Sequence, residues 1–178
     1  MHRLNISRRS GFTLIELLVV VAIIAILASI AVPVISKAVE NAKKAQARTE
    51  LKTIETALRA YFNEYSKYPQ GSGQADRSYT SESEQAQLMN VLRALNVSPN
   101  NNHVLNPRRI VFLEIPDGSL QNNAFIDPWG NVYRIVLDTN FDNTLTTSEH
   151  GTVRGRPVVV WSKGPDGDAT EEDDLKSW

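Results

Sequence analysis

The sequence predicts an α+β protein in which a long N-terminal helix packs against a small antiparallel β-sheet. Three observations support this fold class. Residues 12–32 form an apolar run that holds one charged residue, Glu16. Residues 51–65 carry apolar side chains at spacings of three and four, the period of an α-helix. Three short Val- and Ile-rich runs follow, and no helical pattern separates them, which favours antiparallel pairing.

The apolar run is long enough to cross a membrane. At about 1.5 Å per residue, a helix of about 20 residues spans the roughly 30 Å hydrocarbon core of a bilayer. The residues before Gly11 include Arg3, Arg8 and Arg9 but no acid. Positive charge ahead of a hydrophobic span is typical of the cytoplasmic side, so we expect the C-terminal bulk of the chain on the opposite side.

Glu16 is the informative exception within the apolar run. An ionised carboxylate inside a bilayer is costly and usually faces a partner. Cleavage between Gly11 and Phe12 would create an α-amino group that could be this partner. The segment Gly11-Phe12-Thr13-Leu14-Ile15-Glu16 resembles the processing motif of the type IV pilin and pseudopilin superfamily. The resemblance implies that a prepilin peptidase cuts after Gly11, that Phe12 becomes N-methylated and that Glu16 acts in assembly.

Two other interpretations of the N-terminal stretch remain open. An ordinary secretory signal would use Ser29-Ile30-Ala31 as its small-residue cleavage site and leave a chain that starts at Val32. A plain signal anchor would be retained uncut. The mature N-terminus separates the three interpretations, because it would be Phe12, Val32 or Met1/His2.

The pilin resemblance also implies a domain organisation. Residues 1–11 would be a leader peptide, 12–33 a transmembrane and assembly helix, 34–66 its amphipathic continuation, and 67–178 a periplasmic globular head. One helix from about Phe12 to Tyr65 would contain Pro33, which should kink it or open its hydrogen bonding. The stripe that would face the head is Leu51, Ile54, Leu58, Tyr61, Phe62 and Tyr65. Favourable helical ion pairs are predicted for Glu40–Lys44 and Glu55–Arg59.

Within the head, a second helix is predicted over residues 82–96. Ser81 and Glu84 have the spacing of a capping box at its start. The predicted strands are 110–115, 132–137 and 158–161, each bounded by Pro, Gly, Asn or Asp. Residues 134–157 would hold an enlarged β-hairpin or loop. Together with the long N-terminal helix, these elements match the pilin fold.

Acidic residues gather near the C-terminus, where like charges within nine residues would destabilise a folded loop unless a cation lay among them. Hard oxygen ligands on a loop suit Ca²⁺. The turn Asp127-Pro128-Trp129-Gly130 and this loop are similar to those of the major pseudopilins of type II secretion systems. That resemblance implies a calcium site with ligands at Lys163, Asp166, Asp168, Asp173 and Asp174, the first and third through backbone oxygens. The alternative is a solvated acidic tail.

A second calcium-loop pattern lies in the predicted hairpin. Asp138, Asn140, Asp142 and Glu149 fall at positions 1, 3, 5 and 12 of such a loop. Position 6 is usually Gly and here is Asn143, which tolerates the left-handed conformation better than most residues. The alternative is a hairpin loop in which the Asp and Asn residues act as turn formers.

Composition restricts the function classes. The formal net charge is −1, and it falls to −4 once the three leader arginines are removed, so nucleic-acid binding is not expected. There is no cysteine, so the head must rely on its hydrophobic core or on a bound metal. His2, His103 and His150 lack the spacing of a metal pair, and no G-x-S-x-G nucleophile is present. We therefore expect no enzyme activity.

The resemblance implies a structural subunit of a type II secretion pseudopilus. Such a subunit waits in the inner membrane with its head in the periplasm and then polymerises through its N-terminal helix. The implied partners are further copies of the chain, minor pseudopilins, the prepilin peptidase, an inner-membrane assembly platform and a cytoplasmic ATPase. Major and minor subunits both fit the sequence. The alternative is a type IV pilin or minor pilin for adhesion, motility or DNA uptake. Such heads commonly carry a C-terminal disulfide, so the lack of cysteine favours secretion.

Overall fold

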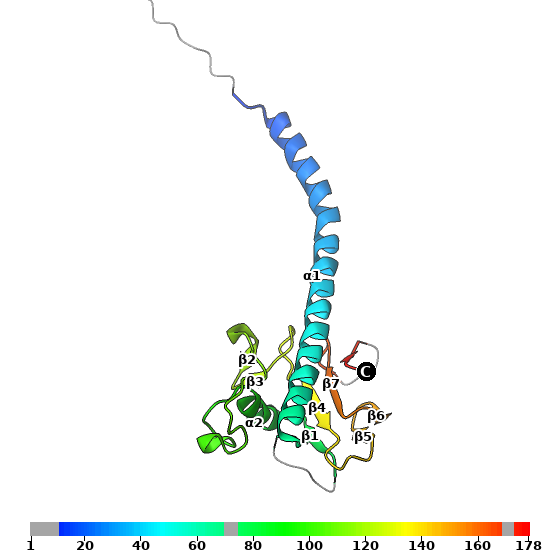
Figure 1. Cartoon of the computed structure of the whole chain (residues 1–178). Helices are drawn as coiled ribbons and strands as arrows, with labels where there is room; N and C mark the ends of the chain where they lie inside the picture. The colour runs from blue at the N-terminus through cyan, green and yellow to red at the C-terminus, as the bar shows by residue number, and fades with distance from the viewer. Residues whose placement is uncertain (1–10, 70–74, 169–172) are drawn as a thin grey trace, which may run out of the picture. The chain divides into compact units, whose positions relative to one another are not determined.

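A computed structural model describes residues 11–69, 75–168 and 173–178 of the chain (Figure 1). Most of the predicted leader, residues 1–10, lies outside the described residues. The chain divides into two compact units, Met1–Asn41 and Ala42–Trp178. The first contains the beginning of helix α1, which runs Leu14–Tyr65. The second unit, which we call the head, contains the rest of α1 and all other helices and strands of the described residues.

Helix α1 confirms the predicted long helix, and it continues through Pro33 without interruption. In the head, the predicted stripe is the buried face of α1: Leu51, Ile54, Leu58 and Tyr61 are buried, and Phe62 and Tyr65 are partly buried. The predicted pair of Glu55 and Arg59 is also formed, with 2.8 Å between Oε1 and Nη2.

The central sheet of the head is antiparallel, as predicted, with strand order β1-β4-β7-β8. Its strands are β1 Arg77–Tyr79, β4 Arg134–Leu137, β7 Val158–Ser162 and β8 Leu175–Lys176. The strands β4 and β7 confirm two of the three predicted runs. A separate hairpin pairs β5 Thr144–Thr147 with β6 Gly151–Arg154, inside the segment where an enlarged hairpin or loop was expected.

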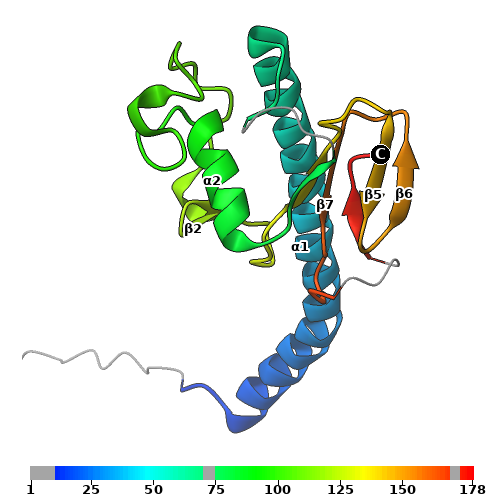
Figure 2. The same ribbon diagram turned by 90° about the horizontal axis from the view of Figure 1, so that it is seen from below.

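Alternation along the strands buries the sheet on both faces. Ile135 and Leu137 of β4, together with Val158 and Val160 of β7, join α1 and α2 in the main core. Between them, Val136, Val159 and Trp161 point the other way and pack with Leu145 of β5 in a second, smaller core. Figure 2 shows the β5–β6 hairpin and the C-terminus side by side, away from α2. The hairpin therefore supplies the second layer that covers the sheet.

Helix α2 (Glu82–Leu92) begins with the predicted capping box. The Ser81 hydroxyl accepts from the Glu84 amide, and the Glu84 carboxylate accepts from the Ser81 amide. The helix ends at Leu92, four residues before the predicted end at Asn96, and Ala94 has a left-handed φ of 56°.

The predicted strand over residues 110–115 is wrong, because this segment has no strand structure. Both the Phe112 and the Leu113 amides donate to the carbonyl of Leu92 at the end of α2, at 2.8 and 3.3 Å. Leu113 and Ile115 are nevertheless buried in the main core. Burial without a pairing strand explains why this segment has a strand-like composition. The other short elements are η1 Asn101–His103, η2 Asp117–Ser119, β2 Leu120–Gln121 and β3 Ala124–Phe125.

Candidate functional site

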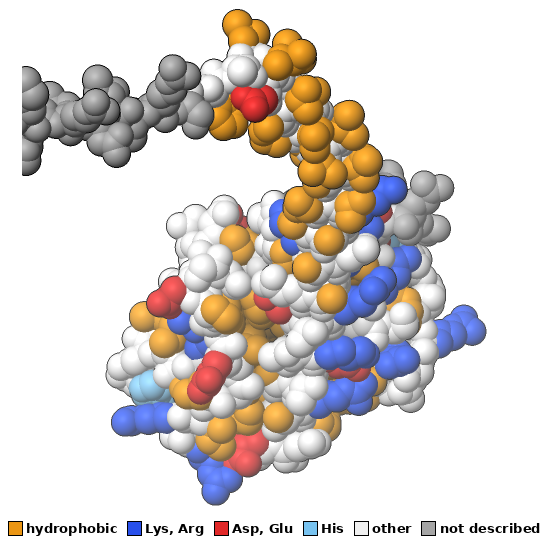
Figure 3. All heavy atoms as spheres, turned by 90° about the horizontal axis from the view of Figure 1, so that it is seen from above, with side chains coloured by type: hydrophobic (Ala, Val, Ile, Leu, Met, Phe, Trp, Pro, Cys, Tyr) orange, Lys and Arg blue, Asp and Glu red, His pale blue; other side chains and the backbone are white. Residues whose placement is uncertain are grey.

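The first candidate site is the apolar start of α1. All the residues from Gly11 to Val39 are exposed in the single chain. Figure 3 shows hydrophobic side chains covering this part of the helix. By length and composition, α1 is the one helix among the described residues that could cross a membrane. Such a surface is stable only in a bilayer or against other helices.

Glu16 is held at the first turn of this helix by a second capping box. Its Oε2 accepts hydrogen bonds from the Thr13 amide at 2.8 Å and from the Thr13 hydroxyl at 2.7 Å. In return, the Glu16 amide donates to the Thr13 hydroxyl at 3.2 Å. The sequence argument assigned Glu16 to assembly and missed this local role, although the Thr-x-x-Glu spacing signals it.

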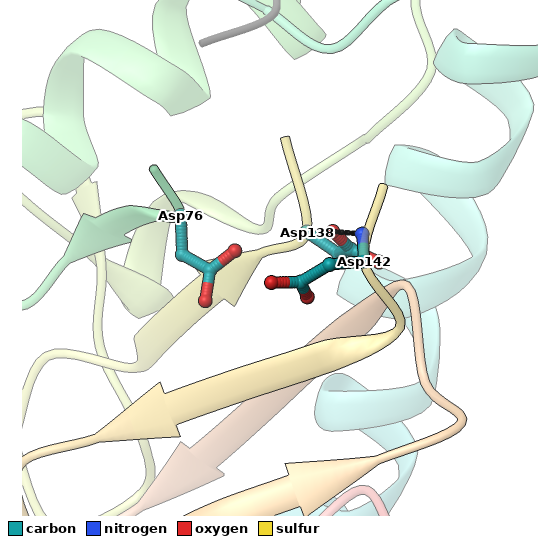
Figure 4. Close-up of side chains that lie close together, drawn as sticks. All are labelled: Asp76, Asp138 and Asp142. Carbon is teal, nitrogen blue, oxygen red and sulfur yellow. Dashed lines mark hydrogen bonds between the residues drawn. The ribbon is translucent and has the colours of Figure 1, made fainter. Parts of the chain in front are cut away.

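The second candidate site is a group of three aspartates, Asp76, Asp138 and Asp142, that could hold a metal ion. One carboxylate oxygen from each lies within 4.8 Å of the others. Figure 4 shows the carboxylates of Asp76 and Asp142 pointing toward each other, with Asp138 beside Asp142. Among the described residues, this is the only group of three or more metal-ligating side chains that meets this distance.

Two different parts of the sequence build this aspartate group. Asp76 precedes β1 and Asp138 follows β4, and the antiparallel register pairs Arg77 with Leu137, so the two aspartates are the next residues on facing strands. Asp142 lies in the loop that leads to β5. Asp138 is 3% exposed, and its two oxygens accept from the amides of Asp142 and Asn143 at 3.2 and 3.0 Å. The loop is therefore folded around the Asp138 carboxylate.

The carboxylate of Asp76 lies in an unfavourable electrostatic environment. Its Oδ1 is buried and has no hydrogen-bond partner within the described part of the chain. Burial raises the pKa of Asp76; a backbone hydrogen bond from Thr146 opposes the rise, and the negative charges of Asp142 and Asp138 add to it. A cation bound between the three carboxylates would attract each of them and so offset their mutual repulsion.

The structure only partly matches the calcium-loop pattern predicted for residues 138–149. It brings Asp138 and Asp142 together, and Asn140 supports Asp142 through a hydrogen bond from Nδ2 to Oδ2 at 3.0 Å. Glu149 is engaged elsewhere: it accepts from the Trp161 indole and lies 3.3 Å from Nε of Arg134. Sequence reasoning missed Asp76 because no signal in the sequence identifies its three-residue strand as the neighbour of β4.

The third candidate site is the predicted calcium loop near the C-terminus, of which residues 169–172 lie outside the described residues. Asp166 is exposed, and its Oδ1 accepts from the Asp168 amide at 2.9 Å. Lys163 directly follows β7. Asp173 lies against Gly164, where an added Cβ would come within 2.7 Å of the Asp173 carbonyl oxygen. The close approach of these two residues brings the ends of the loop together.

Asp174, the last of the predicted ligands, faces a different group. Its Oδ2 lies 2.9 Å from Nε2 of His150, and the side chains are 0% and 2% exposed. Burial raises the pKa of Asp174 to about 6, and the charges of Asp173 and Glu149 add to the rise. In the described part of the loop, Asp166, Asp173 and Asp174 do not converge as a metal-ligating group. The calcium set inferred for this loop, Asp174 included, stays a prediction.

The loop is joined to the predicted turn at Asp127 through a buried network. Oδ1 of Asp127 accepts from the amides of Trp129 and Asn131, and Oδ2 accepts from the Ser162 hydroxyl at 2.6 Å. The Ser162 hydroxyl in turn accepts from the Gly164 amide at 3.1 Å. These hydrogen bonds tie the Asp-Pro-Trp-Gly segment to the start of the C-terminal loop and satisfy buried polar groups on both sides.

Comparison with known families addresses the N-terminal segment directly. Residues 6–32 match the family model of the prokaryotic N-terminal methylation motif. The match covers Arg8 and Arg9 of the leader, the Gly–Phe step and Glu16. The chain is similar in this segment to proteins of the type IV pilin and pseudopilin superfamily. Within this superfamily, a membrane-anchored subunit fits the exposed apolar part of α1.

Curated relatives of this chain include proteins of type II secretion systems. The type II secretion system core protein G of Klebsiella pneumoniae is 29% identical over 172 residues, which are 97% of this chain and 96% of that protein. The core protein G of Vibrio cholerae is 29% identical over 98% of this chain and 94% of that protein. The type IV major pilin protein PilA of Myxococcus xanthus is 49% identical, but over only 34% of this chain. No solved structure matches.

Proposed function

We propose that this chain is a structural subunit of the pseudopilus of a type II secretion system. The observation that carries this proposal is the similarity to core protein G over nearly the whole chain, from the methylation motif through the head. The similarity to the type IV major pilin covers 61 residues and leaves most of the head unmatched. A type IV pilin or minor pilin for adhesion, motility or DNA uptake is therefore the second candidate.

The N-terminal segment would act in two steps. A prepilin peptidase cuts between Gly11 and Phe12, and Phe12 is then N-methylated. In the filament, the carboxylate of Glu16 pairs with the Phe12 amine of a neighbouring copy. Because surrounding apolar helices exclude water, a Glu16 left without a partner in such a filament would be strongly unfavourable. The pairing thus selects one register between neighbouring helices.

The charge of the leader supports an orientation for the membrane-bound subunit. Arg3, Arg8 and Arg9 keep the N-terminus in the cytoplasm, and the head lies in the periplasm. A cytoplasmic ATPase and an inner-membrane platform then extract the subunit into the growing pseudopilus, together with minor pseudopilins. In this role the chain is a mechanical part and catalyses no reaction.

Calcium is the cation we propose for the head. Ca²⁺ takes six to eight oxygen ligands at about 2.3–2.6 Å, and Asp76, Asp138 and Asp142 offer closely spaced carboxylates on a strand edge and a loop. The loop that contains Asp166, Asp168 and Asp173, with Lys163 at its start, is the second place. The ligand set inferred for this loop also includes Asp174, whose Oδ2 lies 2.9 Å from Nε2 of His150.

Co-expression with a reconstituted type II assembly machinery tests the proposed function. We expect periplasmic filaments, and subunits whose mass corresponds to a methylated N-terminus at Phe12. A parallel expression with a type IV pilus machinery should give fewer filaments or none. Efficient filaments from the type IV machinery alone would favour the second candidate. A mature protein that starts at Met1 or Val32 would overturn both.

A further inference from the structure

Helix α1 carries a group of cations between its apolar segment and the part that the head buries. The first buried residue of α1 is Ala47. We call residues 34–46, which lie between Pro33 and this point, the neck. Its charged residues are three lysines and one acid: Lys37, Glu40, Lys43 and Lys44. Neither the pilin resemblance nor the proposed function gives these lysines a role.

The neck is open to its surroundings in the single chain. Every residue from Val34 to Val39 is exposed, whereas Lys43 and Lys44 are half-buried. The apolar side chains of the neck are uncovered as well: Val34, Ile35 and Val39 are 62%, 60% and 52% exposed. A helical segment that mixes exposed apolar side chains with lysines is suited to the boundary between a bilayer and water.

Position along α1 puts the three lysines near the membrane surface. The apolar segment ends at Val32, and the helix continues from it through the neck. At about 1.5 Å per residue, Lys37 lies about 8 Å beyond Val32, and Lys44 lies about 18 Å beyond it. The polar layer of a bilayer is about 5–8 Å thick on each side of the hydrocarbon core. Lys37 therefore falls at the headgroups, and Lys43 and Lys44 fall about 10 Å outside them.

The direction of helical side chains shortens this distance. In an α-helix each Cα–Cβ bond tilts toward the N-terminus, which for α1 is the end in the membrane. The four-carbon stem of a lysine then carries its ammonium group back toward the headgroups. At physiological ionic strength, charges act on one another over about 8 Å. The ammonium groups of Lys43 and Lys44 therefore lie within reach of charges at the membrane surface.

Charge selects an anionic partner for the neck. Its three lysines and Glu40 give a side-chain charge of +2, although the chain after Gly11 has −4 in total. An acidic surface on a second copy would complement this charge. A bilayer surface, however, lies beside the neck of every anchored subunit, whether or not a second copy is present. Anionic phospholipid headgroups are therefore the favoured partner.

We propose that Lys37, Lys43 and Lys44 bind the phosphate groups of anionic phospholipids at the membrane surface on the side of the head. The contact rests on the membrane-anchored subunit of the proposed function, but it does not depend on which filament the subunit enters. It fixes the depth of α1 in the bilayer, because the lysines hold the neck at the headgroups while the apolar segment fills the hydrocarbon core.

Native mass spectrometry of the full chain tests the lipid contact. The chain is released from nanodiscs made of equal parts of phosphatidylcholine and phosphatidylglycerol, and the retained lipids are counted. We expect the wild type to retain phosphatidylglycerol in at least about fivefold excess over phosphatidylcholine. In the triple variant Lys37→Gln/Lys43→Gln/Lys44→Gln, the excess should disappear. Added salt should lower the excess in the wild type, because it screens the lysines.

The matched control is the triple variant Lys67→Gln/Arg109→Gln/Arg154→Gln, which removes three exposed cations of the head and should keep the full excess. Loss of the excess in both triple variants would overturn the proposal, because net charge alone would then explain lipid selection. An excess that survives in the neck variant would overturn it as well. Should the neck variant fail to fold, an excess in the wild type that salt leaves unchanged still contradicts the contact.

The wild type also separates this contact from the anchoring on which it rests. Equal retention of the two lipids would overturn the lysine contact and leave the membrane-anchored subunit intact. Retention of neither lipid, by a chain that stays in solution without detergent, would overturn both.

Discussion

The carboxylate of Glu16 accepts two hydrogen bonds from Thr13, one from its backbone amide and one from its hydroxyl. The residue assigned to assembly is therefore also the residue that completes the first turn of α1. Capping satisfies an amide that would otherwise lack a partner. Because capping and assembly both use the side chain of residue 16, only a substitution that keeps the capping hydrogen bonds and removes the charge can separate the two roles.

Gly164 and Gly155 provide a matched test of the C-terminal loop. Both have a positive φ, of 68° and 72°, so Ala is strained at either position. An added Cβ at Gly155 meets nothing within 4 Å, whereas at Gly164 it lies 2.7 Å from the carbonyl oxygen of Asp173. Gly155→Ala should cost about 1 kcal/mol of unfolding free energy, and Gly164→Ala should cost about 2 kcal/mol more.

Denaturant unfolding followed by tryptophan fluorescence measures this difference, because Trp129, Trp161 and Trp178 all lie in the head. Equal losses in the two variants would contradict the close approach of Gly164 to Asp173.

Glu55 makes the stability of the head dependent on pH. Burial by itself raises the pKa of Glu55, but hydrogen bonds from Lys52 and Arg59 outweigh burial and hold the pKa below its usual range. A lowered pKa contributes stability above the ordinary carboxyl pKa, and this stability is lost as the pH falls through the lowered value. Glu55→Gln should therefore lower the unfolding free energy at pH 7 by about 1–2 kcal/mol and have less effect as the pH falls below about 4.

Parallel unfolding titrations at pH 7 and in acid check this expectation. Glu114→Gln, which alters an exposed carboxylate, is the control and should change neither value. A loss that is the same at both pH values would mean that Glu55 acts through packing instead of charge.

Calcium should stabilise the head if the group of three aspartates binds it. At a hundredfold excess over Kd, the ion adds about 2.7 kcal/mol, so chelation should lower the melting temperature of the wild type. Asp76→Asn should abolish the calcium-dependent increase. In EDTA the same variant should be slightly more stable than the wild type, because the pKa of Asp76 is raised by burial and by its acidic neighbours.

Asp117→Asn, in the exposed η2 turn, is the control and should keep the full calcium response. Asp173→Asn examines the C-terminal loop separately. A calcium response that survives in Asp76→Asn but is lost in Asp173→Asn would assign the ion to the C-terminal loop.

Features that depend on near neighbours in sequence were predictable. The stripe from Leu51 to Tyr61 gave the buried face of α1, and the Ser81–Glu84 spacing gave the start of α2. Both patterns repeat within one or two helical turns, so the sequence contains the whole signal. The Gly11-Phe12 step and Glu16 were recognised for the same reason, since the motif is contiguous.

Features that depend on distant partners were not predictable. The segment 110–115 has the composition of a strand, but the amides of Phe112 and Leu113 donate to the carbonyl of Leu92 and the segment pairs with no strand. Asp76 joins Asp138 only because β1 pairs with β4, and a three-residue strand carries almost no pattern. Asp174 was grouped with its acidic neighbours in sequence, and in the fold its Oδ2 also meets His150, a contact that sequence distance hides. In each case a tertiary contact overrides the local composition.

The most direct test of the account is filament formation by Glu16→Gln, co-expressed with the type II assembly machinery. Glutamine can still complete the capping box with Thr13, but it carries no charge to pair with the Phe12 amine of a neighbouring copy. Glu16→Ala, which removes both roles, is the companion variant. We predict that Glu16→Gln is cleaved and keeps the wild-type melting temperature of the head, yet forms few or no filaments, as Glu16→Ala does. Wild-type amounts of filament from Glu16→Gln would contradict the claim that charge pairing at Glu16 drives assembly.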